Sequence, residues 1–432
     1  MQTRQPILVV GAGFVGLATA TFLAGLGYRV TVAEKNPYTV ESLSDGRLHF
    51  REPLLAAKFS SVVQRNRLTI VRPSRDLFVN APMIIIAIDS VDPADWSMRT
   101  NDFERMASWI GHSERRQRGV VILKSTNILG FSQWFAGELG RTPSGAMLEL
   151  AVCPEFLREG LAFEDTAKPW RVVVGADAAG TRRSVTSFYR RIYGRRIPIV
   201  TVDSRAAELI KLSSNLYLSH RLAFIHEVAE YARRHDLDMA AIGRGIGLDP
   251  RIGQEYFRPG LGFGGSCLPK DCHLINAGEL GQKFTFESAR TALAVNQSVL
   301  DGVVDSLKDR LGNLRGRRIA FWGVAFKPES DDVRGSTAVG LALMLRRRGA
   351  RVSLHDPYLI GAEKITQGNL PLIGDRAQVL SGASALVIGT AHRRFKNWKA
   401  SEAASIMKSK VVVDRYGLLS RRSWEKAGFE FV

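Results

Sequence analysis

The feature that most constrains the fold is a short apolar run that leads directly into three spaced glycines. Ile7–Val10 reads as a buried β-strand, and the segment GAGFVG follows it at once at residues 11–16. Apolar residues at helical spacing continue over Thr19–Leu26, and a second strand over Arg29–Ala33 ends on Glu34. This order of strand, glycine turn, helix, strand and acid is typical of a parallel Rossmann-like unit. It predicts an α/β fold.

Each part of this turn has a physical reason to bind a dinucleotide. The first glycine permits the tight turn, the second lets a pyrophosphate approach the backbone, and the third lets helix and strand pack closely. Glu34 can accept hydrogen bonds from ribose hydroxyls and repels a 2′-phosphate, which favours NAD over NADP. A glycine turn that binds nothing is the alternative. The expected contacts with NAD are Gly11, Gly13, Phe14, Val15, Gly16, Glu34 and Lys35.

Further strands of a parallel sheet are predicted at Met83–Ile88, Val120–Leu123, Val172–Val174 and Ile199–Val202. The second of them ends on Lys124-Ser125-Thr126, at the carboxyl edge of the sheet, where ligands bind in open α/β sheets. The segment CPEFLREG follows at residues 153–160. If it is helical, Glu155 and Glu159 share one face.

Two long helices are predicted in the middle of the chain. The first runs over Arg205–Arg234, with Ser204 as a possible cap, and the second over Glu287–Leu311. Lys211 and Asn215 lie four residues apart on the first, a pair that by composition alone indicates a solvated turn. Long helices between two α/β halves often form a dimer interface.

The second half repeats the pattern of the first. Strands are predicted at Ile319–Trp322, Arg351–His355, Ala385–Ile388 and Val411–Val413, with a helix at Thr337–Arg348. The GxGxxG spacing is lost, so we expect another phosphorylated ligand here rather than a dinucleotide. The predicted fold class is therefore α/β, with two Rossmann-like domains joined by a long central helix and a helical dimerisation region. The predicted domains are 1–200, 201–312 and 313–432.

A glycine-rich loop between these halves carries a cysteine. Gly260–Asp271 reads GLGFGGSCLPKD, with Cys267 near its centre. Glycines allow close approach of a ligand to the backbone, and a thiolate held there can attack an electrophilic carbon. A tight turn with an inert, buried cysteine is the alternative.

Composition restricts the classes of function. The chain has 432 residues, 45% of them hydrophobic, and no apolar run long enough to span a membrane. The N-terminus lacks a signal-peptide pattern, and three cysteines form neither a disulfide framework nor a metal-binding spacing, so we expect a cytoplasmic protein without a metal. The net charge of +18 is spread along the chain without a basic tail, which argues against nucleic acid. Binding of an anionic substrate would account for part of this positive charge.

Seven motifs in order give the chain a specific resemblance. They are GAGFVG, KST, PEFLREG, the Lys211/Asn215 pair, DPRIG at 249–253, GFGGSCLPKD at 262–271 and AFKPESDDVR at 325–334. In these motifs the chain resembles the nucleotide-sugar 6-dehydrogenases, the family of UDP-glucose and GDP-mannose dehydrogenases. The resemblance implies that a primary alcohol is oxidised twice, to a carboxylate, with two NAD molecules reduced.

The resemblance also implies roles for the catalytic residues. Cys267 would attack the aldehyde and carry a thiohemiacetal and then a thioester. Lys211 and Asn215 would stabilise the oxyanion. Water would be held by Asp271 and Thr126, with Glu159 as general base.

Contacts with the ligands are implied in the same way. Arg251 would reach the substrate of the neighbouring subunit in a homodimer. Further cofactor contacts would come from Ser125, Thr126, Glu159 and Arg334. Substrate contacts would come from Glu155, Phe156, Leu157, Lys211, Asn215, Tyr256, Phe257, Gly264, Phe326 and Lys327.

Three positions depart from the family's pattern. Asp89-Ser90 stands where the family carries Thr-Pro, and Arg415-Tyr416 stands where it carries Gly-Arg. The family's Glu-Pro-Gly-Leu appears as Glu52-Pro53-Leu54-Leu55, a change that we expect to be structural. Ser266 precedes the cysteine where N-acetylhexosamine enzymes tend to carry histidine, and AFKPESDDVR favours UDP-glucose over GDP-mannose as the substrate. A one-step hydroxy-acid dehydrogenase that does not need Cys267 and a non-catalytic basic protein are the alternatives.

Overall fold

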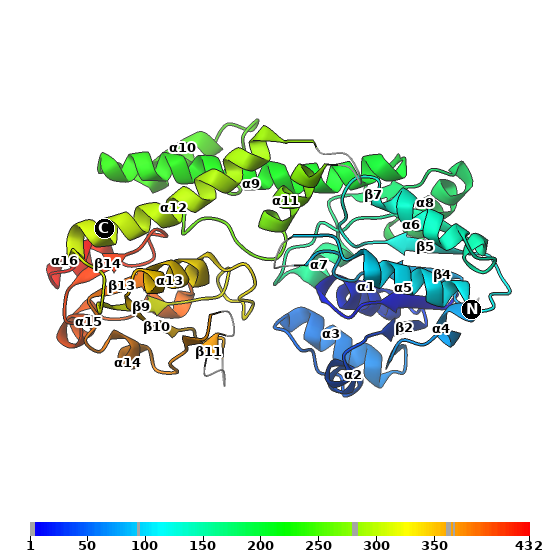
Figure 1. The fold of residues 1–432 in the computed structure, drawn as a ribbon, viewed down its shortest axis with the longest axis horizontal. Coiled ribbons are helices and arrows are strands. Elements are labelled where there is room, and N and C mark those ends of the chain that lie inside the picture. The colour runs from blue at the N-terminus through cyan, green and yellow to red at the C-terminus, as the bar shows by residue number, and fades with distance from the viewer. Residues whose placement is uncertain (1–4, 93–95, 279–283, 360–363, 366–367) are drawn as a thin grey trace. The chain divides into compact units, whose positions relative to one another are not determined.

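The computed structural model describes residues 5–92, 96–278, 284–359, 364–365 and 368–432 (Figure 1). The chain divides into two compact units. The first contains Met1–Ser214 and His273–Thr285, and the second contains Asn215–Cys272 and Phe286–Val432. Each unit carries a sheet of mainly parallel strands, so the predicted α/β fold with two Rossmann-like sheets and a long helix is confirmed.

The sheet of the first unit has eight strands in the order β3-β2-β1-β4-β5-β6-β7-β8. All neighbouring pairs are parallel except β6 with β7. The strand order reverses beside β1, so the carboxyl ends of β1 and β4 form a crevice suited to a ligand. The strands are β1 (Ile7–Val10), β2 (Val30–Ala33), β3 (Leu68–Val71), β4 (Met83–Ile86), β5 (Gly119–Leu123), β6 (Leu148–Val152), β7 (Val172–Gly175) and β8 (Ile199–Val202).

Two of these strands, β3 and β6, were not predicted. In β6 the exposed Glu149 interrupts the apolar run, and its carboxylate accepts a hydrogen bond from the Thr181 hydroxyl. β3 lies at the edge of the sheet and alternates buried Leu68 and Ile70 with more exposed residues. Both strands are short, and their polar residues interrupt the apolar run by which a buried strand is predicted.

Helix α1 (Phe14–Gly25) fills the space next to the glycine turn. Leu17, Ala18, Ala20 and Ala24 are fully buried, because α1 packs between α3 (Pro53–Gln64) and α7 (Ala162–Ala167) as well as against the sheet. A helix that is apolar on every side is a buried helix. The other helices of this unit are α2 (Pro37–Ser44), α4 (Asp76–Val79), α5 (Thr100–Gly111), α6 (Phe131–Gly140) and α8 (Ala179–Tyr193).

The long helix α9 (Ser204–Arg234) begins one residue earlier than predicted, and Ser204 is not its cap. Asp203 is the cap, because its Oδ1 accepts a hydrogen bond from the Ala206 N–H at 2.8 Å. The Ser204 hydroxyl donates to Asp177 instead. Further helices are α10 (Met239–Gly247), α11 (Leu268–Ala277) and α12 (Glu287–Leu311), of which α12 has the predicted bounds.

The second unit contains a five-stranded parallel sheet in the order β10-β9-β13-β14-β15. Trp322 at the end of β9 is fully buried and stacks with Phe395, which anchors one face of the sheet. The strands are β9 (Arg318–Trp322), β10 (Arg351–His355), β13 (Ala385–Ile388), β14 (Val411–Val413) and β15 (Glu430–Phe431); a separate pair is β11 (Lys364–Ile365) with β12 (Leu370–Pro371). The helices are α13 (Thr337–Arg347), α14 (Arg376–Leu380), α15 (Ala400–Ile406) and α16 (Arg421–Lys426).

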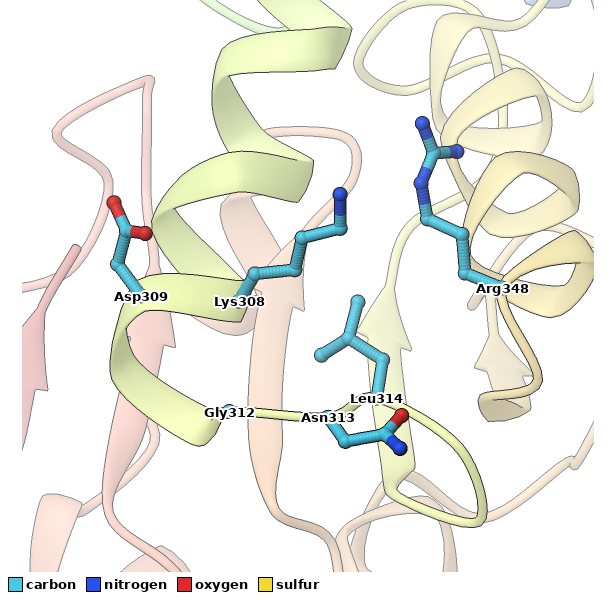
Figure 2. A pocket seen from close by; sticks show the side chains of 6 residues that line it. All are labelled: Lys308, Asp309, Gly312, Asn313, Leu314 and Arg348. Carbon is cyan, nitrogen blue, oxygen red and sulfur yellow. The ribbon is translucent and has the colours of Figure 1, made fainter.

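A hollow of about 440 Å³ in this unit lies where α12 and α13 end (Figure 2). Basic side chains at the C-terminal ends of helices are stabilised by the helix dipole, which accounts for the positions of Lys308 and Arg348. None of the predicted site residues lines the hollow, so it is not the candidate active site. Its lining consists of Lys308, Asp309, Gly312, Asn313, Leu314 and Arg348.

Candidate active site

The glycine turn after β1 has the geometry of a dinucleotide site. Gly11 has a φ of +101°, and a Cβ there would collide with the Ala87 carbonyl. A Cβ on Gly16 would collide with the Gly11 carbonyl. Gly13 faces open space, since a Cβ there would have no atom within 4 Å, and α1 begins at the next residue. The turn therefore leaves room for a phosphate at the N-terminus of α1.

Glu34 lies beside this turn. Its Oε2 accepts a hydrogen bond from the Ala12 N–H at 3.1 Å, and its Oε1 accepts from the Asn36 N–H at 2.8 Å. A carboxylate fixed there can bind ribose hydroxyls and repels an additional phosphate. Lys35 is exposed, and its Nζ lies 3.5 Å from Oδ2 of Asp102 on α5.

The KST motif is bound to the loop after β4. Ser125 Oγ donates to the Ile88 carbonyl at 2.7 Å and accepts from the Ile88 N–H at 3.1 Å. The buried Ser90 donates its hydroxyl to the Thr126 carbonyl, while Asp89 is exposed. At this departure from the expected Thr-Pro, the hydroxyl of Ser90 therefore holds the backbone of Thr126 in place.

The segment CPEFLREG is not helical, so the condition under which Glu155 and Glu159 would share a helical face is not met. The side chain of Glu155 bends back along its own backbone, and its Oε2 accepts from the Leu157 N–H at 2.8 Å. The buried Glu52 accepts from the Gly160 N–H and fixes the turn that contains the half-buried Glu159. Local side-chain hydrogen bonds of this kind compete with a helix.

Lys211 of α9 is 4% exposed and binds this segment. Its Nζ donates to the Glu155 carbonyl at 2.8 Å and to Oε1 of the same residue at 2.9 Å. Two cations lie near the ring of Phe156, with the Arg171 guanidinium 3.8 Å and the Lys211 ammonium 5.4 Å from its centroid. The solvated turn that composition favoured for Lys211 is therefore wrong.

In the second unit, Asn215 and Asp271 form a buried pair. Asn215 Nδ2 donates to Asp271 Oδ2 at 2.5 Å, and Lys270 Nζ lies 2.6 Å from Asp271 Oδ1. Asp271 is fully buried. The exposed Cys267 immediately precedes α11, and its carbonyl accepts the Asp271 N–H at 2.8 Å. The start of a helix favours a negatively charged group such as a thiolate.

Sequence reasoning missed the residues that hold the cysteine loop. Asn296 of α12 accepts from the Phe263 N–H at 2.6 Å and donates to the Phe263 carbonyl at 2.9 Å. The Gly260 N–H donates to Nε2 of the buried His226 at 3.1 Å. Tyr416 packs directly on Gly260, and its hydroxyl donates to the Gly389 carbonyl at 2.9 Å. The only hint of these residues in the sequence was Tyr416, which departs from the family's pattern and had no explanation.

Two glycine loops of the second unit touch through their backbones. The Gly265 N–H donates to the Gly335 carbonyl at 3.2 Å, and a Cβ on either Gly264 or Gly335 would collide with the opposite loop. A Cβ on Gly265 would lie 2.8 Å from the ring of Phe326. The motif AFKPESDDVR, which ends next to Gly335, is thereby fixed against the loop of Cys267.

The turn after β9 is occupied by an acid of its own chain. Asp356 Oδ2 accepts from the Val324 N–H at 2.8 Å and the Ala325 N–H at 3.0 Å, and the buried His392 contacts the same oxygen at 3.0 Å. A dinucleotide phosphate would have to compete with this carboxylate. Arg334, on the loop that follows, forms an exposed two-point contact with Asp332.

The DPRIG segment and the residues after it lie in the second unit. Arg251 is exposed and its guanidinium is held by Asp249, 2.6 Å away. Tyr256 adopts a φ of +65°, which is unusual for a residue with a side chain. Phe257 is buried beneath Arg221, whose guanidinium lies 4.7 Å from the ring centroid.

Known proteins resemble this chain over most of its length. Residues 5–193, 205–298 and 320–421 match the NAD binding, central and UDP binding domains of the UDP-glucose/GDP-mannose dehydrogenase family. A UDP-glucose 6-dehydrogenase of Rhizobium meliloti is 30% identical over 98% of both chains. The solved UDP-glucose dehydrogenase of Pyrobaculum islandicum is 32% identical, covers 98% of this chain and 99% of its own, and superposes with a TM-score of 0.87.

The chain belongs to the UDP-glucose/GDP-mannose dehydrogenase family. A UDP-glucose 6-dehydrogenase of Bacillus subtilis, TuaD, is 27% identical over 98% of this chain and 92% of its own. The solved UDP-N-acetylmannosamine dehydrogenase of Pyrococcus horikoshii is 23% identical, covers 99% of this chain and 98% of its own, and has a TM-score of 0.85, which shows the common fold.

Membership of the dehydrogenase family establishes an NAD-dependent oxidoreductase of nucleotide sugars. The glycine turn and Glu34 lie in the part that matches the family's NAD binding domain, and their geometry fits NAD. Lys327 and Arg334 lie in the part that matches the UDP binding domain. In the described part of this dehydrogenase, no helix is both long and apolar enough to cross a membrane.

Proposed function

We propose that the protein oxidises the C6 alcohol of UDP-glucose to a carboxylate, giving UDP-glucuronate, with GDP-mannose or a related nucleotide sugar as the alternative substrate. The observation that carries this proposal is an exposed thiol, Cys267, at the start of helix α11, whose buried Asp271 pairs with Asn215 of α9. The relatives of 30% and 32% identity, both named as UDP-glucose dehydrogenases, favour UDP-glucose.

The proposed chemistry proceeds in two oxidations. NAD, when bound, accepts a hydride in each of them. The first oxidation removes a hydride and a proton from the alcohol and leaves an aldehyde. The thiolate of Cys267 adds to the aldehyde carbon, which gives a thiohemiacetal, and the second oxidation converts this to a thioester. Water then breaks the carbon–sulfur bond, which releases the carboxylate and regenerates the thiol.

Residues of the chain hold the charges and protons of these steps. Lys211, by its charge, and Asn215, as a donor, stabilise the oxyanion at the sugar carbon. Asp271 and Thr126 hold the water that hydrolyses the thioester, and Glu159 accepts its proton. The fixed contacts of Lys211 with Glu155 and of Asn215 with Asp271 support these roles, because a preorganised donor costs little to orient.

Binding of the two ligands is assigned to separate stretches. Residues 1–200 bind NAD, 201–312 carry the catalytic loop and a dimer interface, and 313–432 bind the nucleotide. We assign the cofactor contacts to Gly11, Gly13, Phe14, Val15, Gly16, Glu34, Lys35, Ser125, Thr126, Glu159 and Arg334. We assign the substrate contacts to Glu155, Phe156, Leu157, Lys211, Asn215, Arg251, Tyr256, Phe257, Gly264, Phe326 and Lys327.

We also propose that the chain forms a homodimer through α9. Tyr217, Phe224 and Tyr231 are 60%, 48% and 64% exposed and recur every seven residues, so they form one apolar stripe on the helix. A stripe of large side chains on one helix can pack against the same stripe of a second copy. Arg251, exposed beside Leu248 and Ile252, would then reach the neighbouring subunit.

The decisive experiment measures NADH formed per sugar consumed with a panel of nucleotide sugars. Two NADH per UDP-glucose, and the loss of the second oxidation in Cys267→Ser, would support the proposal. Cys272→Ser is the matched control, because Cys272 is buried and has no proposed role. A single NADH per substrate, or full conversion to the uronate by Cys267→Ser, would overturn the covalent mechanism.

A further inference from the structure

Lys124 has no role in the chemistry described so far, although it lies next to residues that do. Its backbone N–H donates to the Ile86 carbonyl at 2.8 Å, which fixes it at the carboxyl edge of the sheet. Its ammonium donates to the Cys153 carbonyl at 3.3 Å. The side chain lines a cavity of about 60 Å³ together with Cys153 and Glu155. Lys124 therefore lies beside the segment that Lys211 also holds.

The two lysines bind one short segment from different elements. Lys124, after β5, donates to the carbonyl of Cys153, and Lys211, on α9, donates to the carbonyl of Glu155 two residues further on. Lys211 also contacts the Glu155 carboxylate at 2.9 Å. A carboxylate this close cancels most of the field of an ammonium at a third group. The pair of Lys211 and Glu155 alone would thus be a weak source of positive charge.

Lys124 changes this balance. It interacts electrostatically with both Glu155 and Lys211; burial and the charge of Lys211 lower the pKa of Lys124, whereas Cys153 and Glu155 raise it. Burial raises the pKa of Cys153 to about 12, so its thiol carries no charge at neutral pH. When both lysines are protonated, two ammonium groups and one carboxylate leave a net single positive charge.

The remaining charged groups around the cavity do not offset this excess. Asp165 is paired with Arg158 at 2.8 Å, and Arg171 lies over the ring of Phe156. Burial raises the pKa of Tyr189 well above its usual value, so its hydroxyl stays neutral. Lys124 and Glu155 line the cavity, and Lys211 contacts Glu155 from α9, so the cluster of these three residues is positive.

We propose that Lys124 is a positioning residue that supplies the excess positive charge through which Lys211 stabilises the oxyanion in both oxidations. This inference rests on the proposed function. Lys124 acts through Lys211 and Glu155, by holding the backbone between Cys153 and Glu155 and by offsetting the Glu155 carboxylate, and it does not touch the substrate.

The first test is the variant Lys124→Met, assayed with UDP-glucose and NAD. We expect kcat to fall about tenfold, because one charge that acts on the transition state is lost, with both KM values nearly unchanged. The alkaline limb of the kcat–pH profile should move to higher pH, because Lys211 loses a neighbour of like charge and holds its proton longer. Lys124→Arg should keep most of the activity. Lys168→Met, an exposed lysine of the same unit, is the control and should behave like the wild type.

The second test separates charge from structure. Glu155→Gln should move the alkaline limb to lower pH, opposite to Lys124→Met, and the double variant Lys124→Met/Glu155→Gln should recover several-fold in kcat over Lys124→Met. NAD binding and thermal unfolding show whether each variant folds, and Lys124→Gln takes the place of Lys124→Met if that variant does not fold. A wild type that makes two NADH while Lys124→Met matches it in kcat and pH profile overturns this inference alone. A wild type that makes no NADH from any nucleotide sugar overturns the proposed function and this inference with it.

Discussion

Asn215 and Asp271, 56 residues apart in the sequence, are joined by a hydrogen bond of 2.5 Å between Nδ2 and Oδ2. Asp271 is fully buried and Asn215 is 9% exposed, so water does not replace either partner readily. The bond links the long helix α9 to the first turn of α11, directly after Cys267. The position of the thiol therefore depends on a polar contact inside the protein.

Replacing Asn215 with alanine should lower stability as well as activity. The Asp271 carboxylate would lose one of its buried donors, which costs about 1–3 kcal/mol. We expect the urea midpoint to fall accordingly, together with a loss of thioester hydrolysis. Asn276→Ala, at the end of helix α11, is the control for a general effect of changes in α11 on the urea midpoint. An unchanged urea midpoint in Asn215→Ala would contradict the importance of the pair.

Glu34→Gln should weaken the preference for NAD. The variant keeps the side-chain length but loses the charge beside the Ala12 N–H, which repels a 2′-phosphate. We expect the ratio of kcat/KM for NAD to that for NADP to fall about tenfold. Glu41→Gln, on α2, is a control that changes the same charge away from the turn. If the ratio stays at the wild-type value, Glu34 does not select the cofactor.

Gly335→Ala should impair catalysis by displacing the loop of Cys267. Gly335 has a φ of +60°, and a Cβ there would meet the Gly265 carbonyl, so the loop of Cys267 would have to move. Gly316 also has a positive φ, +75°, but no atom lies within 4 Å of a Cβ there. Gly316→Ala therefore measures backbone strain alone. We expect slower alkylation of Cys267 by a thiol reagent, or a large fall in kcat, only in Gly335→Ala.

Glu208 should make the stability of the protein depend on pH. It accepts hydrogen bonds from the Gly130 and Ser132 N–H groups at 2.8 Å, and burial raises its pKa to about 7. Because the folded state then binds the proton more tightly than the unfolded state, this contribution is complete below about pH 4.5 and is lost as pH rises to about 7. The loss amounts to up to about 3 kcal/mol.

The measurement is the difference in unfolding free energy between wild type and Glu208→Gln at pH 5 and pH 8. Glutamine does not ionise, so the variant should lack this part of the pH dependence and should become relatively more stable at pH 8. A parallel pH dependence in both proteins would show that Glu208 does not titrate in this range.

Phe224→Glu should abolish self-association if α9 forms the dimer interface. Phe224 lies at the centre of the exposed stripe, and a buried charge without a partner is costly. We expect light scattering to give the mass of two chains for the wild type and of one chain for the variant. Glu402→Lys, at an exposed position of α15 away from α9, is a charge control. A wild type that is monomeric at micromolar concentration would exclude this interface.

Much of the fold could be predicted because its signals are local. The strands β1, β8, β10, β13 and β14 and helix α12 have the predicted bounds, since continuous apolar runs or helical periodicity specify them. The conformation of the segment with Glu155 and Glu159 could not be predicted, because a side-chain hydrogen bond and the distant Glu52 determine it. The sequence of the segment itself contains no information about a partner as distant as Glu52.

The same limit applies to the candidate site. Sequence motifs pointed to Cys267 and Asp271, but not to Asn296, His226 or Tyr416, which hold the loop through contacts over long sequence separations. Single asparagine, histidine and tyrosine residues in apolar helices or loops have no distinctive pattern. Their function becomes visible only when the backbone that they bind is known.

The carboxylate of Asp356 on the turn after β9 limits how this unit could be redesigned. Grafting the GAGFVG segment into that turn would restore its glycines. The Asp356 carboxylate, held by His392, would still occupy the backbone N–H groups that a phosphate needs. Converting the unit into a second dinucleotide carrier would require the removal of a buried acid and its histidine together. A turn closed in this way cannot be opened to a cofactor by single substitutions.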